Sequence, residues 1–325
     1  MIYENLKKIE EKVIEGDTYT LSKLITAIEN GEELAFQIVS DLLSFAGKAH
    51  VIGVTGSGGV GKSTLVSALI KLIRGSQKKV GVLLIDPSSA LSGGAFLGDR
   101  ALMKEHASDP GVFIRSFASR GAKGGFNRNV WAALEVMDAR GYDYVIIETL
   151  GAGQDEVDIF QLVHTVIVVL TPACGNELQL LKAGFCEIGH LFVINKSDLP
   201  GADIMEANLH GVLSFKTEQN REKWQPKVIR TEALKEKGIE EVYKSLIEHG
   251  EFLKKQGIFQ QCVFKRRKKA LQMFAEEIIH QIIINTFEKK SEEIRKKIKN
   301  GFEFKTVLKE LTKDICLEIK KTLDT

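Results

Sequence analysis

The chain is poor in the features that mark several common protein classes. It has four cysteines in 325 residues, and no two of them form a CxxC pair. This spacing argues against a disulfide framework and against a zinc site built from thiolates, and it favours reduced thiols. Basic and acidic residues nearly cancel, at 45 and 43, so the net charge of +2 gives no argument for nucleic acid or a membrane surface as partner.

Long apolar runs are missing as well. The N-terminal stretch MIYENLKKIEEKVIEGD alternates charged and apolar residues at helical spacing and lacks the apolar core of a signal peptide. We see no segment with the length and apolar character of a membrane span, and no obvious internal repeat. The sequence therefore predicts a cytoplasmic protein, and its 44% of hydrophobic residues suffices for one large domain with an appendage.

Short β-rich runs alternate with helix-length segments through the middle of the chain. The runs are HVIGVTG, KVGVLLID, GVFIRSF, YDYVIIET, HTVIVVLT, HLFVINK and PKVIRTEA. Continuous apolar strands that alternate with helices indicate a mostly parallel sheet buried on both faces, in a doubly wound α/β domain. We expect this domain over residues 48–250, a helical segment over 1–47 and long helices over 251–325.

The C-terminal region carries an apolar set at helical spacing, formed by Leu271, Phe274, Ile278 and Ile282. Such a set needs a surface to cover, either the α/β domain or a second copy of the chain. The basic run 265–269 lies just before it. No aromatic platform accompanies this run, so we expect a solvated helix face rather than a contact with nucleic acid.

The strongest chemical signal is GSGGVGKST, which follows an apolar strand and precedes a helix-length segment. It fits the phosphate-binding pattern G-x-x-x-x-G-K-S/T, in which glycines let backbone N–H groups turn toward phosphate oxygens. Lys62 is expected to reach the β- and γ-phosphates, and the Ser63 hydroxyl to ligate Mg²⁺. The pattern predicts a P-loop NTPase. The candidate phosphate-binding residues are Gly56, Ser57, Gly58, Gly59, Val60, Gly61, Lys62, Ser63 and Thr64.

A second motif, NKSD at 195–198, ends another apolar strand and indicates guanine. The Asp198 carboxylate can accept hydrogen bonds from the ring N–H and the exocyclic amine of guanine, whereas adenine presents an acceptor at that ring position. Asn195 is expected to brace the loop, and the stem of Lys196 to lie over the base. A later loop should close over the base edge through backbone N–H groups. Its candidate residues are Glu232, Ala233 and Leu234.

Three acidic residues between these motifs are candidates for the metal side of the site. Asp86 and Glu148 end apolar strands, and the carboxyl ends of parallel strands face the ligand crevice. Asp99 follows thirteen residues after Asp86. Mg²⁺ prefers six oxygen ligands and keeps several waters, so these acids, together with Ser63, could hold it partly through water.

Taken in order, six segments resemble the G-protein chaperones of adenosylcobalamin-dependent acyl-CoA mutases, the MeaB/ArgK type related to the human methylmalonic aciduria type A protein. They are GVTGSGGVGKST, DPSSALSGGAFLGDRALM, VFIRSFASRGAKGG, ETLGAGQDEVD, NELQLLKAG and INKSD. The resemblance covers almost the whole chain. It implies a GTPase with GTP or GDP and Mg²⁺ as cofactors, a C-terminal helical arm that forms a homodimer, and a mutase partner whose cobalamin loading and protection are timed by GTP hydrolysis.

The resemblance also assigns a third switch and shows where the chain departs from the family pattern. TPACGNELQLLKAG is similar to that switch, and Lys182 matches its lysine. Asn176 stands where the family has an acid, and Glu232 replaces a small hydroxyl residue in the base-edge loop. The missing carboxylate at 176 is expected to weaken the pairing of the switch with a basic partner.

The segment ETLGAGQ bears on the rate of hydrolysis. In small signalling GTPases a water-orienting glutamine follows the glycine directly, but here Ala152 fills that slot and Gln154 lies two residues further. A methyl group cannot orient water, so we expect slow unassisted hydrolysis and a partner that completes the site. Gln154 could hold water or brace the switch. The candidate catalytic residues are Lys62, Glu148, Gln154 and Lys182.

Two other functions fit parts of the pattern. A GTPase metallochaperone for a nickel enzyme shares the fold but usually shows clustered histidine or cysteine, whereas the seven histidines here are scattered. An ATP-dependent kinase of a transport protein, an assignment once attached to ArgK-like relatives, is disfavoured by Asp198. Among the mutases, those for methylmalonyl-CoA, isobutyryl-CoA, ethylmalonyl-CoA and other carbon-skeleton substrates stay open as partners.

Overall fold

The computed structural model describes residues 2–86, 104–106, 108–118, 128–149, 160–172, 185–217, 224–299 and 303–323. Three candidate site residues, Asp99, Gln154 and Lys182, lie outside these ranges, and so does the third-switch residue Asn176. Asp86 is described as the last residue of a strand, but its side chain is not.

Seven strands form one parallel sheet, which confirms the predicted P-loop α/β fold. The strands are β1 His50–Thr55, β2 Val80–Asp86, β3 Val112–Ala118, β4 Tyr144–Thr149, β5 Thr165–Leu170, β6 Leu191–Asn195 and β7 Lys227–Thr231. Their order across the sheet is β3-β2-β4-β1-β5-β6-β7, and every neighbouring pair is parallel. Each of the seven apolar runs identified in the sequence forms one of these strands.

Helices connect and cover the strands. Those described are α1 Ile2–Glu15, α2 Thr18–Glu29, α3 Glu33–Leu42, α4 Lys62–Gly75, α6 Arg128–Ala139, α9 Phe185–Ile188, α10 Ala202–Thr217, α11 Ile239–Lys255, α12 Ile258–Lys289, α13 Ser291–Lys299 and α14 Phe304–Leu323. Three short 3₁₀ turns are η1 Lys104–His106, η2 Phe160–Leu162 and η3 Ala233–Lys235. No helix within the described residues is both long enough and apolar enough to span a membrane.

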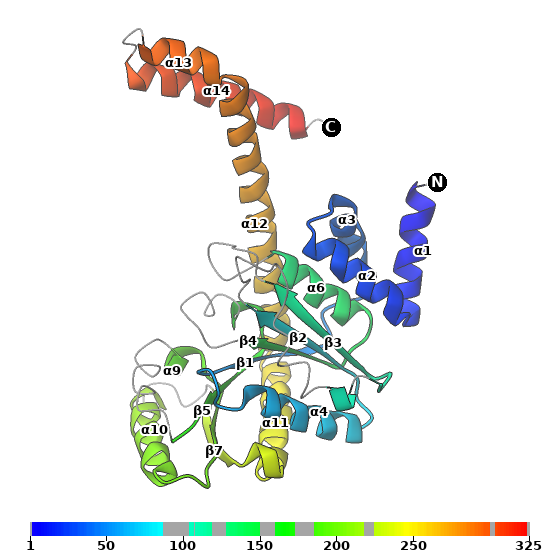
Figure 1. Ribbon diagram of the computed structural model, residues 1–325, viewed down its shortest axis with the longest axis vertical. Helices are drawn as coiled ribbons and strands as arrows, with labels where there is room; N and C mark the ends of the chain where they lie inside the picture. The colour runs from blue at the N-terminus through cyan, green and yellow to red at the C-terminus, as the bar shows by residue number, and fades with distance from the viewer. Residues whose placement is uncertain are drawn as a thin grey trace. The chain divides into compact units, whose positions relative to one another are not determined.

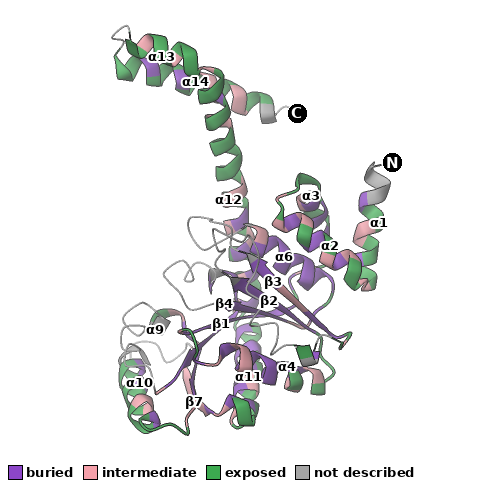
Figure 2. Ribbon diagram, in the orientation of Figure 1, coloured by how far each residue is buried: buried purple, intermediate pink, exposed green. Residues whose placement is uncertain are grey.

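The sheet is buried on both faces, as the continuous apolar strands require. Figure 1 shows α4 and α11 on one face, and α6 with α2 and α3 on the other. Strands β1, β5 and β6 are buried at every position, and β1 is purple in Figure 2. The N-terminal helices are fastened to the domain by an ion pair of 2.8 Å between Arg115 Nη2 on β3 and Glu29 Oε2 on α2.

The chain divides into two compact units, residues 1–266 and 267–325. The boundary falls within α12, because the first turns of that helix pack in the first unit. There Phe259 and Val263 are buried together with Leu253 of α11. In the second unit, α13 and α14 pack together and are linked by an ion pair between Lys297 and Glu310.

Candidate nucleotide-binding site

Strand pairing brings the P-loop beside the candidate metal-side acid. The loop 56–61 begins where β1 ends, and Val54 of β1 is in register with Glu148 of β4. Helix α4 starts at Lys62, directly after the loop, so its N-terminus directs its partial positive charge at the loop. The result is a preformed site for an anion at the carboxyl edge of the sheet.

Two of the four candidate Mg²⁺ ligands are in direct contact. The Ser63 hydroxyl donates to Glu148 Oε1 at 2.7 Å, and the Glu148 side chain is buried. A hydroxyl and a carboxylate are the oxygen ligands that Mg²⁺ favours, so this pair fits the ion. Within the described part of the chain, no group of three histidine, cysteine or acidic residues could hold a metal ion.

The P-loop is lined with positive charge. Lys62 Nζ donates to the carbonyls of Gly56 and Ser57, at 2.7 and 3.0 Å. Lys196 Nζ, which belongs to the guanine motif, donates to the carbonyl of Gly59 at 2.8 Å. Two ammonium groups therefore flank the loop, which suits it to the negative charge of a polyphosphate.

Asn195 joins the P-loop to the base-edge loop, as expected of a bracing residue. Its Nδ2 donates to the Val60 carbonyl at 2.8 Å, while its Oδ1 accepts from Thr231 Oγ1 at 3.1 Å and from the Ala233 N–H at 3.0 Å. The Ala233 N–H is thus already bound to a side chain, so the predicted base-edge donation falls more directly to Leu234. Sequence reasoning did not identify Thr231, because nothing in the spacing marks a strand-end threonine as part of the brace.

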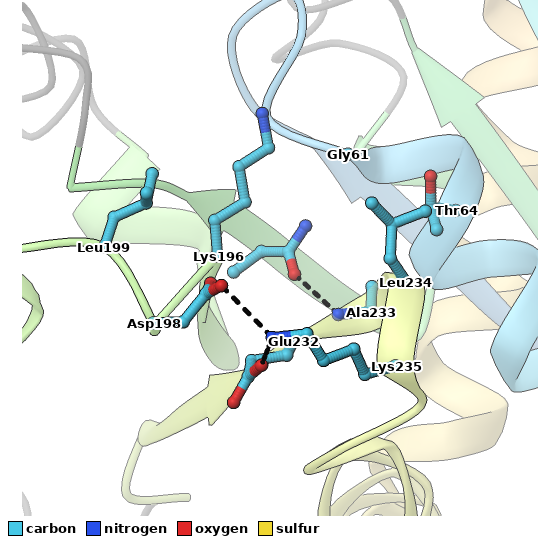
Figure 3. A pocket seen from close by; sticks show the side chains of 10 residues that line it. Gly61, Thr64, Lys196, Asp198, Leu199, Glu232, Ala233, Leu234 and Lys235 are labelled. Carbon is cyan, nitrogen blue, oxygen red and sulfur yellow. Dashed lines mark hydrogen bonds and ion pairs between the residues drawn. The ribbon is translucent and has the colours of Figure 1, made fainter.

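A cavity of about 230 Å³ opens beside these residues (Figure 3). This volume lies below the range typical of whole ligand pockets and suits a nucleobase. Its lining combines the guanine motif, the base-edge loop and the start of the P-loop helix. The lining residues are Gly61, Thr64, Asn195, Lys196, Asp198, Leu199, Glu232, Ala233, Leu234 and Lys235.

Ion pairs run along one wall of the cavity. Lys235 Nζ lies 2.6 Å from Glu232 Oε2 and 3.3 Å from Asp198 Oδ2, and Lys237 Nζ lies 3.0 Å from Glu232 Oε1. The two lysines lower the pKa of Glu232, Lys235 more than Lys237. Glu232 and then Asp198 raise the pKa of Lys235. Glu232 and Lys235 are therefore charged at neutral pH. Lys235 was not among the residues predicted from the sequence.

A substitution at Gly61 tests the brace. Gly61 has a φ of +95°, and an added Cβ would lie 2.3 Å from Asn195 Nδ2. We expect Gly61→Ala to displace the Asn195 amide and to weaken GDP binding at least about tenfold, measured by calorimetric titration, since it adds a clash to the strain of about 1–2 kcal/mol of a left-handed alanine.

Gly59→Ala is the matched control for Gly61→Ala. Gly59 also has a positive φ, +77°, but nothing lies within 4 Å of its added Cβ. It carries the backbone strain without the clash, so its loss of GDP affinity should be clearly smaller. Equal losses of GDP affinity in the two variants would show that Gly61→Ala acts through backbone strain and not through the contacts of Asn195.

Comparisons with known proteins match most of the chain to GTPases. The family model described as "Methylmalonyl Co-A mutase-associated GTPase MeaB" matches residues 21–289. A putative GTPase of Pyrococcus abyssi is 41% identical over 95% of this chain and 93% of its own length. The GTPase ArgK of Escherichia coli is 30% identical over 87% of this chain and 86% of its own length. A solved structure described as LAO/AO transport system kinase has a TM-score of 0.66 and 25% identity, with 96% of this chain and 98% of that one covered.

Proposed function

Because the chain belongs to the MeaB family of methylmalonyl-CoA mutase-associated GTPases and is therefore a GTP-hydrolysing enzyme, we propose that it is a chaperone for an adenosylcobalamin-dependent acyl-CoA mutase. In this role it uses GTP to gate cobalamin loading and to protect or reactivate the mutase. The partner is supported by the family description and by the share of the chain that the family covers. The nucleotide is supported by the position of Asp198 in a base-sized cavity beside the P-loop.

The residues of the site divide the work of binding. Asp198 accepts from the ring N–H and amine of guanine, and Lys196 covers the base while its ammonium reaches the P-loop. The backbone N–H groups of the loop and the N-terminus of α4 bind the phosphates, and Lys62 adds its charge at the β- and γ-phosphates. Because phosphoryl transfer depends mainly on positioning and charge, these contacts account for most of what the protein contributes.

Ser63 and Glu148 are the described residues that would hold Mg²⁺, with Asp86 and Asp99 as the further candidates. When bound, the ion neutralises charge that develops on the transferred phosphate. The hydroxyl of Ser63 and the buried carboxylate of Glu148 already lie 2.7 Å apart, so the chain holds two ligands together at the end of β4. Glu148 thereby also fixes the first turn of α4.

The second unit is proposed to form the homodimer. Its helices expose large apolar side chains, among them Leu271 at 71%, Ile278 at 53% and Phe304 at 78%. Large exposed apolar side chains on long helices suit an interaction surface, and a second copy of the chain offers the same apolar side chains for it to pack against. The proposed setting is the cytoplasm, without nucleic acid or membrane as partner.

The decisive experiment combines co-purification with hydrolysis kinetics. The full chain should co-purify with an acyl-CoA mutase from its source, and the purified mutase should raise the rate of GTP hydrolysis. A stimulation of about 10-fold or more is expected, since a group supplied by a partner can be worth about 10³–10⁵ in related phosphoryl transfers. Lys62→Ala, which removes the phosphate-binding ammonium, should abolish GTP hydrolysis both without and with the mutase.

Three results would count against the proposal. The first is fast single-turnover hydrolysis without any partner, which would remove the need for one. The second is stimulation by a nickel enzyme and nickel rather than by a mutase. The third is a preference for adenine over guanine nucleotides in competition binding, which would point to the kinase assignment instead.

A further inference from the structure

Lys235 occupies a special place in the wall of the base cavity. Its ammonium lies between two carboxylates, Glu232 at 2.6 Å and Asp198 at 3.3 Å. Figure 3 shows both contacts as dashed lines that meet at the Lys235 nitrogen. The shorter distance belongs to Glu232, so Glu232 is the main anchor and Asp198 is the group that the ammonium reaches across to.

Glu232 is held firmly enough to keep Lys235 in that place. Its side chain is only 16% exposed, and its second oxygen accepts from Lys237 Nζ at 3.0 Å. The backbone of residue 232 is paired with that of residue 237 in both directions, at 3.1 and 3.3 Å. A fixed carboxylate therefore keeps a cation within hydrogen-bonding distance of Asp198.

The ammonium and the base need the same acceptor. Guanine offers two N–H donors to Asp198, and a carboxylate receives them best when both of its oxygens are available. Lys235 donates to Oδ2 of that carboxylate. Two donors aimed at one oxygen repel each other, and a positive charge at this distance weakens the pull of the carboxylate on the base.

We propose that Lys235 is an affinity-determining residue of the guanine site, which competes with the base for Asp198 and thereby lowers affinity and speeds nucleotide release. The inference rests on the proposed guanine role of Asp198. In this proposal Glu232 is a positioning residue, because it holds the Lys235 ammonium beside Asp198. Glu232 is also the residue of this loop at which the chain departs from the family pattern. A chaperone whose nucleotide must be exchanged gains faster turnover of GDP from such a competitor.

The test compares Lys235→Met with wild-type protein, using a fluorescent GDP analogue in stopped-flow binding. Because the pair is exposed, at 57% for Lys235 and 47% for Asp198, the effect is limited by solvent screening. The variant should bind about two- to fivefold more tightly, with most of the change in the dissociation rate. The difference in affinity between the variant and wild-type protein should become smaller at high salt, because salt screens exposed charges. Unchanged or weaker binding would overturn the proposal.

Lys237→Met is the matched control. Lys237 also pairs with Glu232, and its described contact is with Glu232 Oε1 rather than with Asp198. The backbone pairing of residues 232 and 237 still holds Glu232 when this lysine is lost, so GDP affinity should stay close to that of wild type. If both variants tighten binding equally, the cause is the general positive charge of the loop and not competition at Asp198, and the proposal fails.

Asp198→Asn separates this inference from the proposed function. If Asp198 recognises guanine, the variant should lose GDP affinity at least tenfold. It should gain affinity for xanthosine diphosphate, whose base has a carbonyl oxygen in place of the guanine amine and can accept a hydrogen bond from the new amide. In that background Lys235→Met should have no further effect on GDP. Unaltered GDP binding by Asp198→Asn overturns the guanine site itself. A loss of GDP affinity in Asp198→Asn, combined with no effect of Lys235→Met in the protein that keeps Asp198, overturns the competition alone.

Discussion

Replacement of Arg266 by methionine is expected to lower the free energy of unfolding by about 3–5 kcal/mol, because it leaves a buried carboxylate without its cation. Arg266 has 0% exposure, and its Nε donates to Glu135 Oε1 on α6 at 2.7 Å. Its Nη1 donates to the Leu162 carbonyl at 3.2 Å. Its Nη2 lies 3.6 Å from Asp138 Oδ2. Urea unfolding of the full chain, followed by circular dichroism, gives the measurement.

Two further variants make the Arg266 result specific. Lys265→Met changes the neighbouring residue of the same basic run, which is exposed, and should alter stability by less than about 0.5 kcal/mol. The double variant Arg266→Met/Glu135→Met removes both charges and should regain much of the loss, since an apolar pair of similar volume can replace a buried ion pair. A loss below about 1 kcal/mol in the single variant would contradict the interpretation.

Asp138 explains why Arg266 matters beyond its own helix. Its two oxygens accept from the backbone N–H groups of Gly47, Lys48 and Ala49, at 2.9 to 3.0 Å. Those residues lead into β1 and so into the P-loop. Arg266 therefore links the first turns of α12 to α6, to the η2 turn and to the entry of the central strand, all within the first unit.

The sequence predicted the strands well, because a sheet buried on both faces requires continuous apolar runs that few other structures need. It also predicted that Ser63, Glu148 and Asn195 belong to one site, since strand ends of a parallel sheet meet at one edge. The structure places Ser63 on Glu148 and Asn195 between two loops. Their roles toward nucleotide and Mg²⁺ stay predictions.

Contacts between distant polar residues could not be predicted in the same way. The expectation that the run 265–269 forms a solvated face was wrong for Arg266, because its burial depends on two acids of α6 about 130 positions earlier in the chain. Lys235 was missed for the same reason. Its place is set by Glu232 and Asp198 together, and spacing along the chain does not reveal which lysine of a basic loop reaches across.

A histidine cluster at the opposite end of the sheet gives the second large effect. Thr165 Oγ1 lies 2.6 Å from His50 Nε2 and 2.7 Å from His249 Nδ1, so one hydroxyl serves two buried rings. His164 Nδ1 accepts from the Val51 N–H at 3.0 Å. That nitrogen must be unprotonated, because a proton there would face another donor.

Burial is the main cause of the low pKa values in this cluster. It lowers the pKa of His50 to about 3 and that of His249 to about 2, and it holds the pKa of His164 well below its usual value. Lys254 adds to the effect at His50, and Arg266 adds to it at His164. His190, which lies beside His249 with ring centroids 4.4 Å apart, has its pKa lowered to about 4.

The protein should therefore lose stability steeply as the pH falls below about 6.5, the ordinary histidine pKa. Below this pH the histidines bind protons in the unfolded chain but stay unprotonated when buried in the folded chain. Each histidine costs about 1.4 kcal/mol per pH unit, so the four together cost roughly 5–6 kcal/mol per unit. Against a typical stability of about 5–15 kcal/mol, unfolding should set in within a few pH units, before most carboxylates titrate.

Urea unfolding at pH 7.5, 6.5 and 5.5 measures how steeply the free energy of unfolding falls with pH. His164→Asn keeps an acceptor for Val51 but binds no proton, and it should reduce the slope by about a quarter, whereas the exposed His280→Asn should leave it unchanged. Equal stability at pH 7.5 and 5.5 would contradict the prediction, because it would show that these histidines bind protons in the folded chain as readily as in the unfolded chain.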